Sequence, residues 1–466
     1  MADRPGHGEP RSYRFPEFSH VRLSNGIDVI AVHLPSRELL TAVLFEAIGA
    51  GDERDDEAGL TVLMARALTE GTRSRDAIAL VEAAERLGAS LHAEAGWDAL
   101  SVGVDVPAPR LEPALDLVAE VMSDPRFPEA EVERLRDERL NDLLQARADP
   151  RRRADEGFVE TIYSAASPYH RPSGGTKATV ERLDAAACRA MHARRYDPSR
   201  MTLIVGGDLE DVDVFELAER KLGGWRPSAT CEGPRTINAA RASNPYRVRV
   251  LDRPGSVQTE IRIGHVGLRR RIPDFHALSV MSAILGGLFN SRLNRVLREE
   301  RGYTYGAGAG FDLRRGAGPF AARAAVNTEV TVPAVEAILA ELQGIRDRPV
   351  TDDELHAARD FLVGVFPLRF ETPAAVVGAI SSIVVHGLPD DELARYRTAV
   401  EAVDRRAVTA AAEAHVRPAD ASILLVGAAD EFLPALEAAN LGPVRVERES
   451  SDDPQMGHST GASSGS

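Results

Sequence analysis

Two hydrogen-bond donors seven residues apart, Arg298 and Tyr305, are the side chains whose types and spacing suggest chemistry in this sequence. A guanidinium presents a fixed fork of donors to a carbonyl or a carboxylate, and a phenolic hydroxyl adds one further donor. The local sequence also fits a structural interpretation, in which an arginine ends a helix, where cations are favoured, and a tyrosine lies half-buried in a strand. Both interpretations stay open on local sequence alone.

The histidines do not form the helical pair that commonly binds zinc. The sequence has 12 histidines, and no two of them lie four residues apart on a predicted helix. Two imidazoles on one helix need that spacing to reach the same metal. We interpret the isolated histidines as structural: His92, His170, His192, His265 and His276.

Arg298 and Tyr305 belong to a predicted helix and to the strand that follows it. Gly302 is a typical helix stop, and residues 303–311 have the small residues of a closely packed strand. This predicts Arg298 in the last helical turn and Tyr305 early in the strand. Six apolar residues have the spacing of the helix's buried stripe: Leu285, Leu288, Phe289, Leu293, Val296 and Leu297.

Length and composition indicate a multidomain globular protein. A chain of 466 residues exceeds one ordinary core, so two to four domains are expected. Acidic residues outnumber basic ones by 71 to 56, for a formal charge of −15. This balance argues against a general nucleic-acid-binding protein, which needs a basic face.

The termini and the cysteines predict a cytoplasmic protein. The N-terminus lacks the apolar segment of a signal peptide, and no apolar run reaches the roughly 18 residues of a membrane span. Cys188 and Cys231 are the only cysteines and give no disulfide framework. We therefore expect no membrane partner and a reduced, cytoplasmic chain.

An internal repeat organises the chain. Residues 196–208 and 416–430 share a proline-containing turn, a buried-strand pattern and an amphipathic helix, about 220 residues apart. Residues 124–137 and 347–360 match at nearly the same offset, each with an acidic first helical turn. The sequence predicts two tandem units, 15–225 and 246–446. They are joined by a linker at 226–245 and flanked by disordered ends at 1–14 and 447–466.

Each unit is predicted to be α+β, with a mixed, mostly antiparallel sheet and helices layered on one face. Asn25-Gly26 is typical of a tight hairpin turn. The expected strands of the first unit cover residues 42–48 and 91–106, and its expected helices cover residues 59–69, 111–122 and 129–148.

With this tandem repeat and these strand and turn patterns, the chain from about Phe15 to Val446 resembles the insulinase/pitrilysin family of zinc peptidases. The clearest anchor is residues 58–72. Active family members carry the inverted zinc motif His-x-x-Glu-His there, between the same Gly-Leu and Gly-Thr ends. The equivalent positions here are Val62, Ala65 and Arg66, and the third ligand position holds Asp142. The resemblance therefore implies no zinc in this chain.

The resemblance also assigns roles to the remaining candidate residues. His92 and Ala93 occupy the edge-strand position where the family has an Asn-Ala pair that contacts substrate backbone. Arg298 and Tyr305 match an Arg/Tyr pair that reaches the zinc site in the other half of the enzyme. There Tyr305 would donate to the oxyanion formed when water attacks the scissile carbonyl, and Arg298 would hold a carbonyl or carboxylate.

The absence of the zinc motif together with the presence of the Arg/Tyr pair is typical of the non-zinc subunit of a bacterial heterodimeric family member. This implies a homologous zinc-bearing partner and an unfolded or leader peptide as substrate. Two other hypotheses remain: a family-derived scaffold or peptide-binding subunit with no part in catalysis, and a homodimeric peptide-binding chamber without chemistry.

Overall fold

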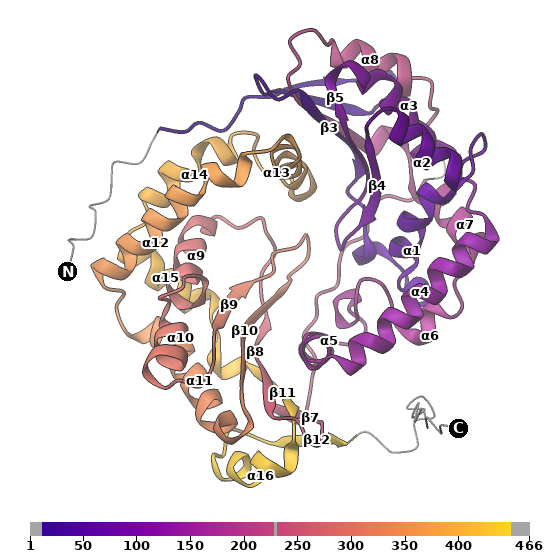
Figure 1. Ribbon diagram of the computed structural model, residues 1–466. Coiled ribbons are helices and arrows are strands. Elements are labelled where there is room, and N and C mark those ends of the chain that lie inside the picture. Colours follow the sequence, from indigo (N-terminus) through magenta and orange to yellow (C-terminus); the bar gives the residue numbers. More distant parts are fainter. Residues whose placement is uncertain (1–11, 228–230, 449–466) are drawn as a thin grey trace, which may run out of the picture.

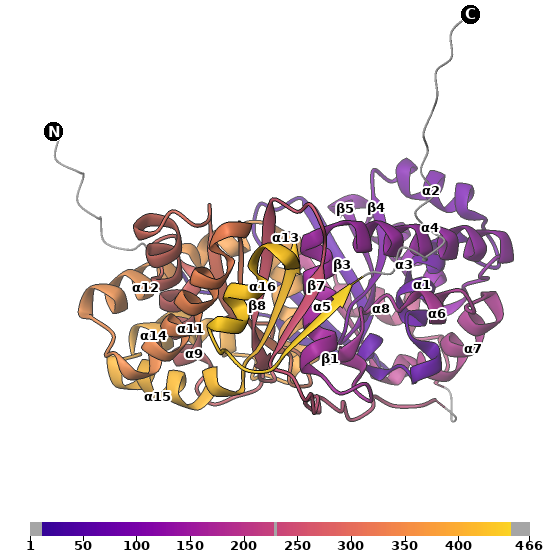
Figure 2. The same ribbon diagram turned by 90° about the horizontal axis from the view of Figure 1, so that it is seen from below.

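The computed structural model describes residues 12–227 and 231–448, and these form two sheets that lie side by side (Figures 1 and 2). The strands of the first sheet are β1 Ser19–Arg22, β2 Asp28–His33, β3 Leu39–Glu46, β4 Ser90–Ala95, β5 Leu100–Pro107 and β6 Met201–Gly207. Those of the second are β7 Val248–Asp252, β8 Gln258–Val266, β9 Ala307–Phe311, β10 Pro319–Asn327, β11 Ser422–Gly427 and β12 Val444–Arg448.

The two sheets repeat one topology. Their strand orders are β1-β2-β6-β3-β5-β4 and β12-β7-β11-β8-β10-β9, so five neighbouring strands correspond one to one. In each sheet the pair β2–β6 or β7–β11 is parallel, and the other pairs among these five are antiparallel. Only the sixth strand differs, since β1 pairs antiparallel and β12 parallel. The predicted α+β class with two tandem units is confirmed.

Helices cover the outer face of each sheet, where buried aliphatic side chains form two separate cores (Figure 1). In the first unit the helices are α1 Leu60–Ala67, α2 Ala77–Arg86, α3 Leu111–Ser123, α4 Glu129–Ala148, α5 Pro150–Ile162, α6 Lys177–Val180, α7 Ala185–Arg195 and α8 Val214–Leu222. In the second they are α9 Phe275–Ser282, α10 Arg292–Asn294, α11 Thr331–Asp347, α12 Asp352–Val365, α13 Pro373–His386, α14 Glu392–Glu401, α15 Arg405–His415 and α16 Ala429–Ala438.

The two units exchange one helix each. Helix α5 of the first unit packs Ala154, Phe158 and Ile162 on strands β7, β8 and β11 of the second sheet. Helix α13 of the second unit packs Val376, Val377 and Ile380 on strands β2, β3 and β6 of the first sheet. Figure 1 shows both helices between the halves, at opposite ends of the facing sheets. Each unit therefore supplies part of the other's buried surface, and the two halves stabilise each other.

Several local predictions need correction. The predicted strand 91–106 is a hairpin, β4 and β5, because the chain reverses in a turn at residues 96–99, where the Gly96 amide donates to the carbonyl of Ala99 at 2.9 Å. The predicted disordered ends, 1–14 and 447–466, lie mostly outside the described residues. However, Tyr13 packs on Phe366, with ring centroids 5.9 Å apart, and β12 continues to Arg448 by pairing with β7. The predicted turn at Asn25-Gly26 does join β1 to β2, and Gly26 has a φ of 97°.

Within the described residues, no single helix is long and apolar enough to cross a membrane. One bent pair, Asp352–Phe370 with Pro373–His386, reaches the required length and composition only when the two helices are taken together.

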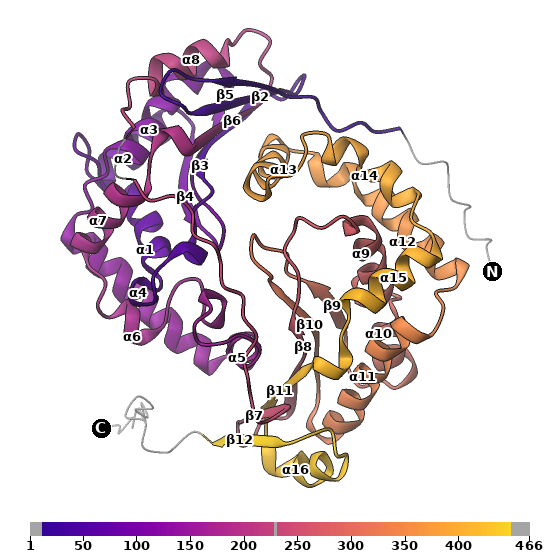
Figure 3. The ribbon, with the colours of Figure 1, turned by 180° about the vertical axis from the view of Figure 1, so that it is seen from behind.

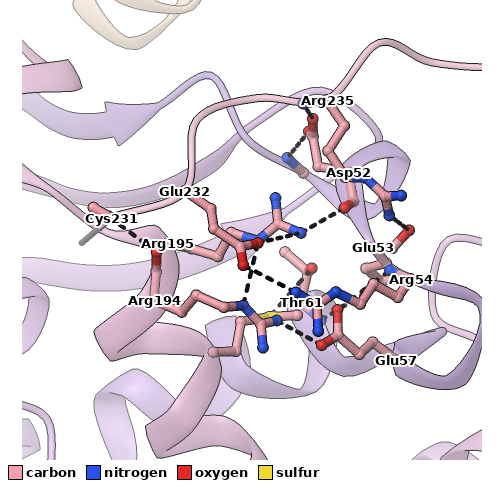
Figure 4. Close-up of polar contacts among 12 residues, drawn as sticks. Asp52, Glu53, Arg54, Glu57, Thr61, Arg194, Arg195, Cys231, Glu232 and Arg235 are labelled. Carbon is pink, nitrogen blue, oxygen red and sulfur yellow. Dashed lines mark hydrogen bonds and ion pairs between the residues drawn. The ribbon is translucent and has the colours of Figure 1, made fainter.

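The described part of the connection between the sheets, residues 231–247, follows the surface of the first unit (Figure 3). Glu232 pairs with Arg54 at 2.9 Å, and Cys231 contacts the carbonyl of Arg194 at 3.1 Å (Figure 4). The Arg235 amide donates to Asp52 at 2.7 Å. This segment is therefore fastened along its length before it enters β7.

The turn between β9 and β10 joins the second unit to the first. Arg315 pairs with Asp52 at 2.6 Å, and its amide donates to Asp98 at 3.0 Å. The neighbouring Arg314 guanidinium lies 4.6 Å from the ring centroids of both Trp97 and Tyr169. Since the Asp52 side chain is only 1% exposed, its negative charge depends on these partners for compensation.

Arg315→Ala is expected to lower the free energy of unfolding by about 3 kcal/mol, because it leaves a buried carboxylate without its charged partner. Arg395→Ala is the control: its ion pair with Asp391 is more than half exposed, and about 0.5 kcal/mol or less should be lost. Urea unfolding of both variants measures the difference. Equal losses would contradict the assigned role of the Asp52 contact.

Candidate functional site

Helix α1 contains the three residues expected at the positions of the zinc motif, and one of them forms an ion pair. Ala65 is fully buried in the core of the first unit, and Val62 is half-buried. Arg66 extends from the same helix to Glu138 on α4, at 2.6 Å, with both side chains partly exposed. Glu138 also receives a hydrogen bond from Arg134 at 2.7 Å. The helix positions expected to correspond to the zinc motif are therefore occupied by a half-buried valine, a buried alanine and an arginine in a surface ion-pair network.

Asp142, at the third ligand position, is also paired with arginines. It lies on α4, where it contacts Arg139 and accepts a hydrogen bond from Arg152 at 2.8 Å. In residues 12–227 and 231–448, no three or more His, Cys, Asp or Glu side chains gather as a metal site would require. Only one of the four expected metal-motif positions has a carboxylate, and its charge is already paired with two arginines. The four positions are Val62, Ala65, Arg66 and Asp142.

A buried acid fixes the start of helix α1. Glu53 accepts hydrogen bonds from the Gly59 and Thr61 amides at 3.0 and 2.7 Å and pairs with Arg171 at 2.9 Å. Its carboxylate thus satisfies amides that the helix itself leaves unpaired, and its charge is favoured at that end. Because its side chain is fully buried, desolvation raises the pKa of Glu53 to about 7, against the opposing effect of Arg171.

Arg298 lies in a one-turn π-helix, Arg295–Glu300, which confirms its predicted place in the last helical turn before Gly302. Its guanidinium lies 3.9 Å from the ring centroid of Phe289. No carboxylate among the described residues forms an ion pair with it, whereas Arg292 pairs with Glu354 and Arg295 with Glu300. Because the guanidinium contacts an aromatic ring and no carboxylate of the described residues, its N–H donors remain available to a ligand.

Phe289 was predicted to be buried, and that prediction is wrong. The helix ends at Gly287, so residues 288–291 form a loop and the helical spacing no longer applies. As a result Phe289 is 66% exposed, while Leu293 and Leu297 beyond the loop are fully buried. The sequence contained a signal for this break in Gly286-Gly287, because a side chain at Gly286 would lie 2.2 Å from the Ala309 amide of β9.

Tyr305 lies before the strand in which it was predicted. Strand β9 begins at Ala307, since Gly306 interrupts the pairing with β10. The Tyr305 side chain is 96% exposed, and its hydroxyl has no hydrogen-bond partner among the described residues. Arg298 and Tyr305 share one helix-to-strand connection, yet no direct contact between them is observed. Both therefore present unpaired donors outward.

His92 and Ala93 lie on β4, the edge strand of the first sheet, and β9 is the corresponding edge strand of the second. The His92 side chain is exposed and lies over Gly103 of β5, where an added Cβ would be only 2.4 Å from its ring nitrogen. Ala93 is half-buried. The edge of β4 therefore keeps backbone donors and acceptors for a further strand.

Family models match two parts of the chain. Residues 28–172 match the insulinase (peptidase family M16) model, and residues 182–362 match the peptidase M16 inactive domain. An uncharacterized zinc protease of Mycobacterium leprae is 25% identical over 366 residues, which cover 78% of this chain and 82% of the relative. A Helicobacter pylori protein described as a non-peptidase homolog is 22% identical over 346 residues, covering 73% and 78%.

Solved structures point to the same family as the family models. A crystal structure described as the peptidase M16 inactive domain from Pseudomonas fluorescens superposes with a TM-score of 0.81 at 25% identity. It covers 88% of this chain and 98% of that one. A Helicobacter pylori protease structure has the same fold, with a TM-score of 0.81 at 18% identity, covering 89% and 100%. The chain belongs to the insulinase family, and residues 182–362 match the model described as the inactive domain of that family.

Zinc is expected to leave the stability of the isolated chain unchanged, because no described cluster of ligands would bind it in the folded state. The melting temperature should agree within about 1 °C with equimolar zinc and with a chelator. Differential scanning calorimetry measures this. A stabilisation that saturates at one zinc per chain would contradict the expectation.

The contribution of Glu53 to stability should fall as the pH rises from about 4.5 to about 7. Between these values Glu53 is ionised in the unfolded chain but protonated in the folded chain. Folding therefore takes up a proton at Glu53 and becomes less favourable as the pH rises. Relative to the wild type, the stability of Glu53→Gln should therefore fall less, or rise more, between these pH values, whereas the exposed Glu82→Gln should leave the pH dependence unchanged. Urea unfolding across this pH range gives both slopes, and parallel slopes would contradict the raised pKa.

Proposed function

We propose that this chain is the substrate-binding, non-zinc subunit of a heterodimeric metallopeptidase that acts in the cytoplasm. A homologous partner with an intact His-x-x-Glu-His motif would hold the zinc, which supplies an activated water for peptide hydrolysis. This chain would contribute Arg298 and Tyr305 to that site. The substrate would be an unfolded or leader peptide, because a chamber between two subunits excludes folded proteins.

One observation carries the proposal. Among the described residues, Arg298 has no carboxylate partner and the hydroxyl of Tyr305, which is 96% exposed, has no hydrogen-bond partner. At the positions expected for the metal motif, Arg66 and Asp142 are instead held in ion pairs. The exposed Tyr305 side chain, and a guanidinium that forms no ion pair within the described residues, add little to the stability of this chain alone. A second subunit would use both residues.

The roles of the two side chains follow from their chemistry. The Tyr305 hydroxyl would donate to the oxyanion that develops on the scissile carbonyl, which is worth more in the transition state than in the bound substrate. The Arg298 fork would hold a carbonyl or carboxylate of the peptide, and Phe289 would keep the guanidinium in place. The free edges of β4 and β9 would let the peptide add as an extra strand.

The alternative is a scaffold or peptide-binding subunit with no role in catalysis. The Helicobacter pylori relative that is described as a non-peptidase homolog supports this alternative. Under it, Arg298 and Tyr305 would contribute only to association, so their substitution would leave turnover by any complex unchanged.

Mixing the chain with its zinc-bearing partner should create peptidase activity that neither chain has alone. Tyr305→Phe should then lower kcat about 100-fold, since one oxyanion donor is lost. Tyr303→Phe is the matched control: Tyr303 lies in the same loop, is half-buried against the core and should be silent. The measurements are kcat and KM on an unstructured peptide, with assembly followed by size-exclusion chromatography.

Two outcomes would overturn the proposal. Full activity of the partner alone would make this chain unnecessary for catalysis. Equal kcat for the wild type and Tyr305→Phe in an intact complex would support the scaffold alternative instead.

A further inference from the structure

The loop that carries Tyr305 is closed at its base by two hydrogen bonds to the preceding helical segment. The Tyr303 amide donates to the carbonyl of Leu297 at 2.7 Å. The Ala307 amide donates to Oδ1 of Asn294 at 2.8 Å. Between them, the Thr304 hydroxyl donates to the carbonyl of Gly306 at 3.0 Å. Tyr305 therefore stands at the exposed end of a short loop whose two sides are fixed.

The loop that carries Phe289 is held by the same asparagine. Nδ2 of Asn294 donates to the carbonyl of Leu288 at 3.1 Å and to the hydroxyl of Ser291 at 3.2 Å. These two acceptors fix the orientation of the side-chain amide, so that Oδ1 faces Ala307. Phe289 lies inside this loop and stacks on Arg298.

Asn294 is therefore shared by two loops, one that supports Arg298 and one that presents Tyr305. It is 8% exposed, and Ser291 is 1% exposed, so water does not readily replace these bonds. A hydrophobic residue of similar size would fill the space but would satisfy neither the Ala307 amide nor the Leu288 carbonyl. Both a donor and an acceptor are needed at this position.

We infer that Asn294 is a positioning residue that sets the relative placement of Arg298 and Tyr305 in the assembled peptidase. This inference rests on the proposed function of those two residues. Asn294 does not touch the substrate: it acts through the Ala307 amide on one side and the Leu288 carbonyl on the other. Without the hydrogen bond from Ala307 to Asn294, the loop would hold Tyr305 in a different position. A small displacement of a catalytic group lowers the reaction rate.

The first experiment uses the isolated full-length chain. In Asn294→Ala, hydrogen exchange of the peptide covering residues 304–311 should be at least about tenfold faster, because the Ala307 amide loses its acceptor. Ser291→Ala is the matched control: it removes a partner of Nδ2 and leaves the acceptor of Ala307 in place. Exchange in Asn294→Ala at the wild-type rate would overturn the inference without bearing on the proposed function.

The second experiment uses the reconstituted complex. Asn294→Ala should lower kcat about 10- to 100-fold with KM and assembly nearly unchanged. Asn294→Asp keeps an oxygen acceptor for Ala307 but loses the donor to Leu288, so it should recover the part of that loss that passes through the Tyr305 loop. This variant also covers the case in which the alanine variant folds poorly. Adding Asn294→Ala to Tyr305→Phe should cost less than the product of the two single losses, because part of the effect of the asparagine acts through the tyrosine.

The outcomes separate the two proposals. Losses that multiply in the double variant, or equal losses for the alanine and aspartate variants, would overturn the role of Asn294 while leaving that of Tyr305 intact. A silent Tyr305→Phe would overturn both.

Discussion

The buried carboxylate of Asp52 is the contact on which the arrangement of the two halves depends. It receives the Gly49 amide from its own unit, the Arg235 amide from the connecting segment and the Arg315 guanidinium from the second unit. Three segments that are distant in sequence thus meet at one charge. Since a buried charge is tolerated only with its partners in place, each segment is needed for the others to be stable.

This junction has a consequence for the candidate site. The turn that Arg315 fastens follows directly on β9, and β9 begins two residues after Tyr305. At the other end of the strand, Asn294 holds the Ala307 amide. The edge strand is therefore anchored at both ends, by the first unit and by its own helical segment. Under the proposed function, such rigidity favours assembly with a second chain, because less conformational entropy is lost.

The sequence correctly predicted the internal repeat, but it did not predict that the two units exchange helices α5 and α13. Residues 196–208 and 416–430 correctly indicated equivalent strands, since buried β-branched and aliphatic runs with the same turns form the same elements. Nothing in the apolar faces of α5 or α13 specifies which of two sheets they cover, so the exchange was not predicted. Phe289 was misplaced because a helical spacing was continued past Gly287, where close approach of β9 ends the helix. Asn294 gave no signal, since its partners are backbone groups that only the fold brings together.

The central claim is that Tyr305 lies at the zinc site of a partner chain. The most direct test places a fluorine-labelled tyrosine at position 305 and substitutes paramagnetic cobalt for zinc in the partner. In the assembled complex the fluorine resonance should broaden strongly with cobalt and stay narrow with zinc. An equally narrow resonance with both metals, in a complex that is active and intact, would contradict the claim.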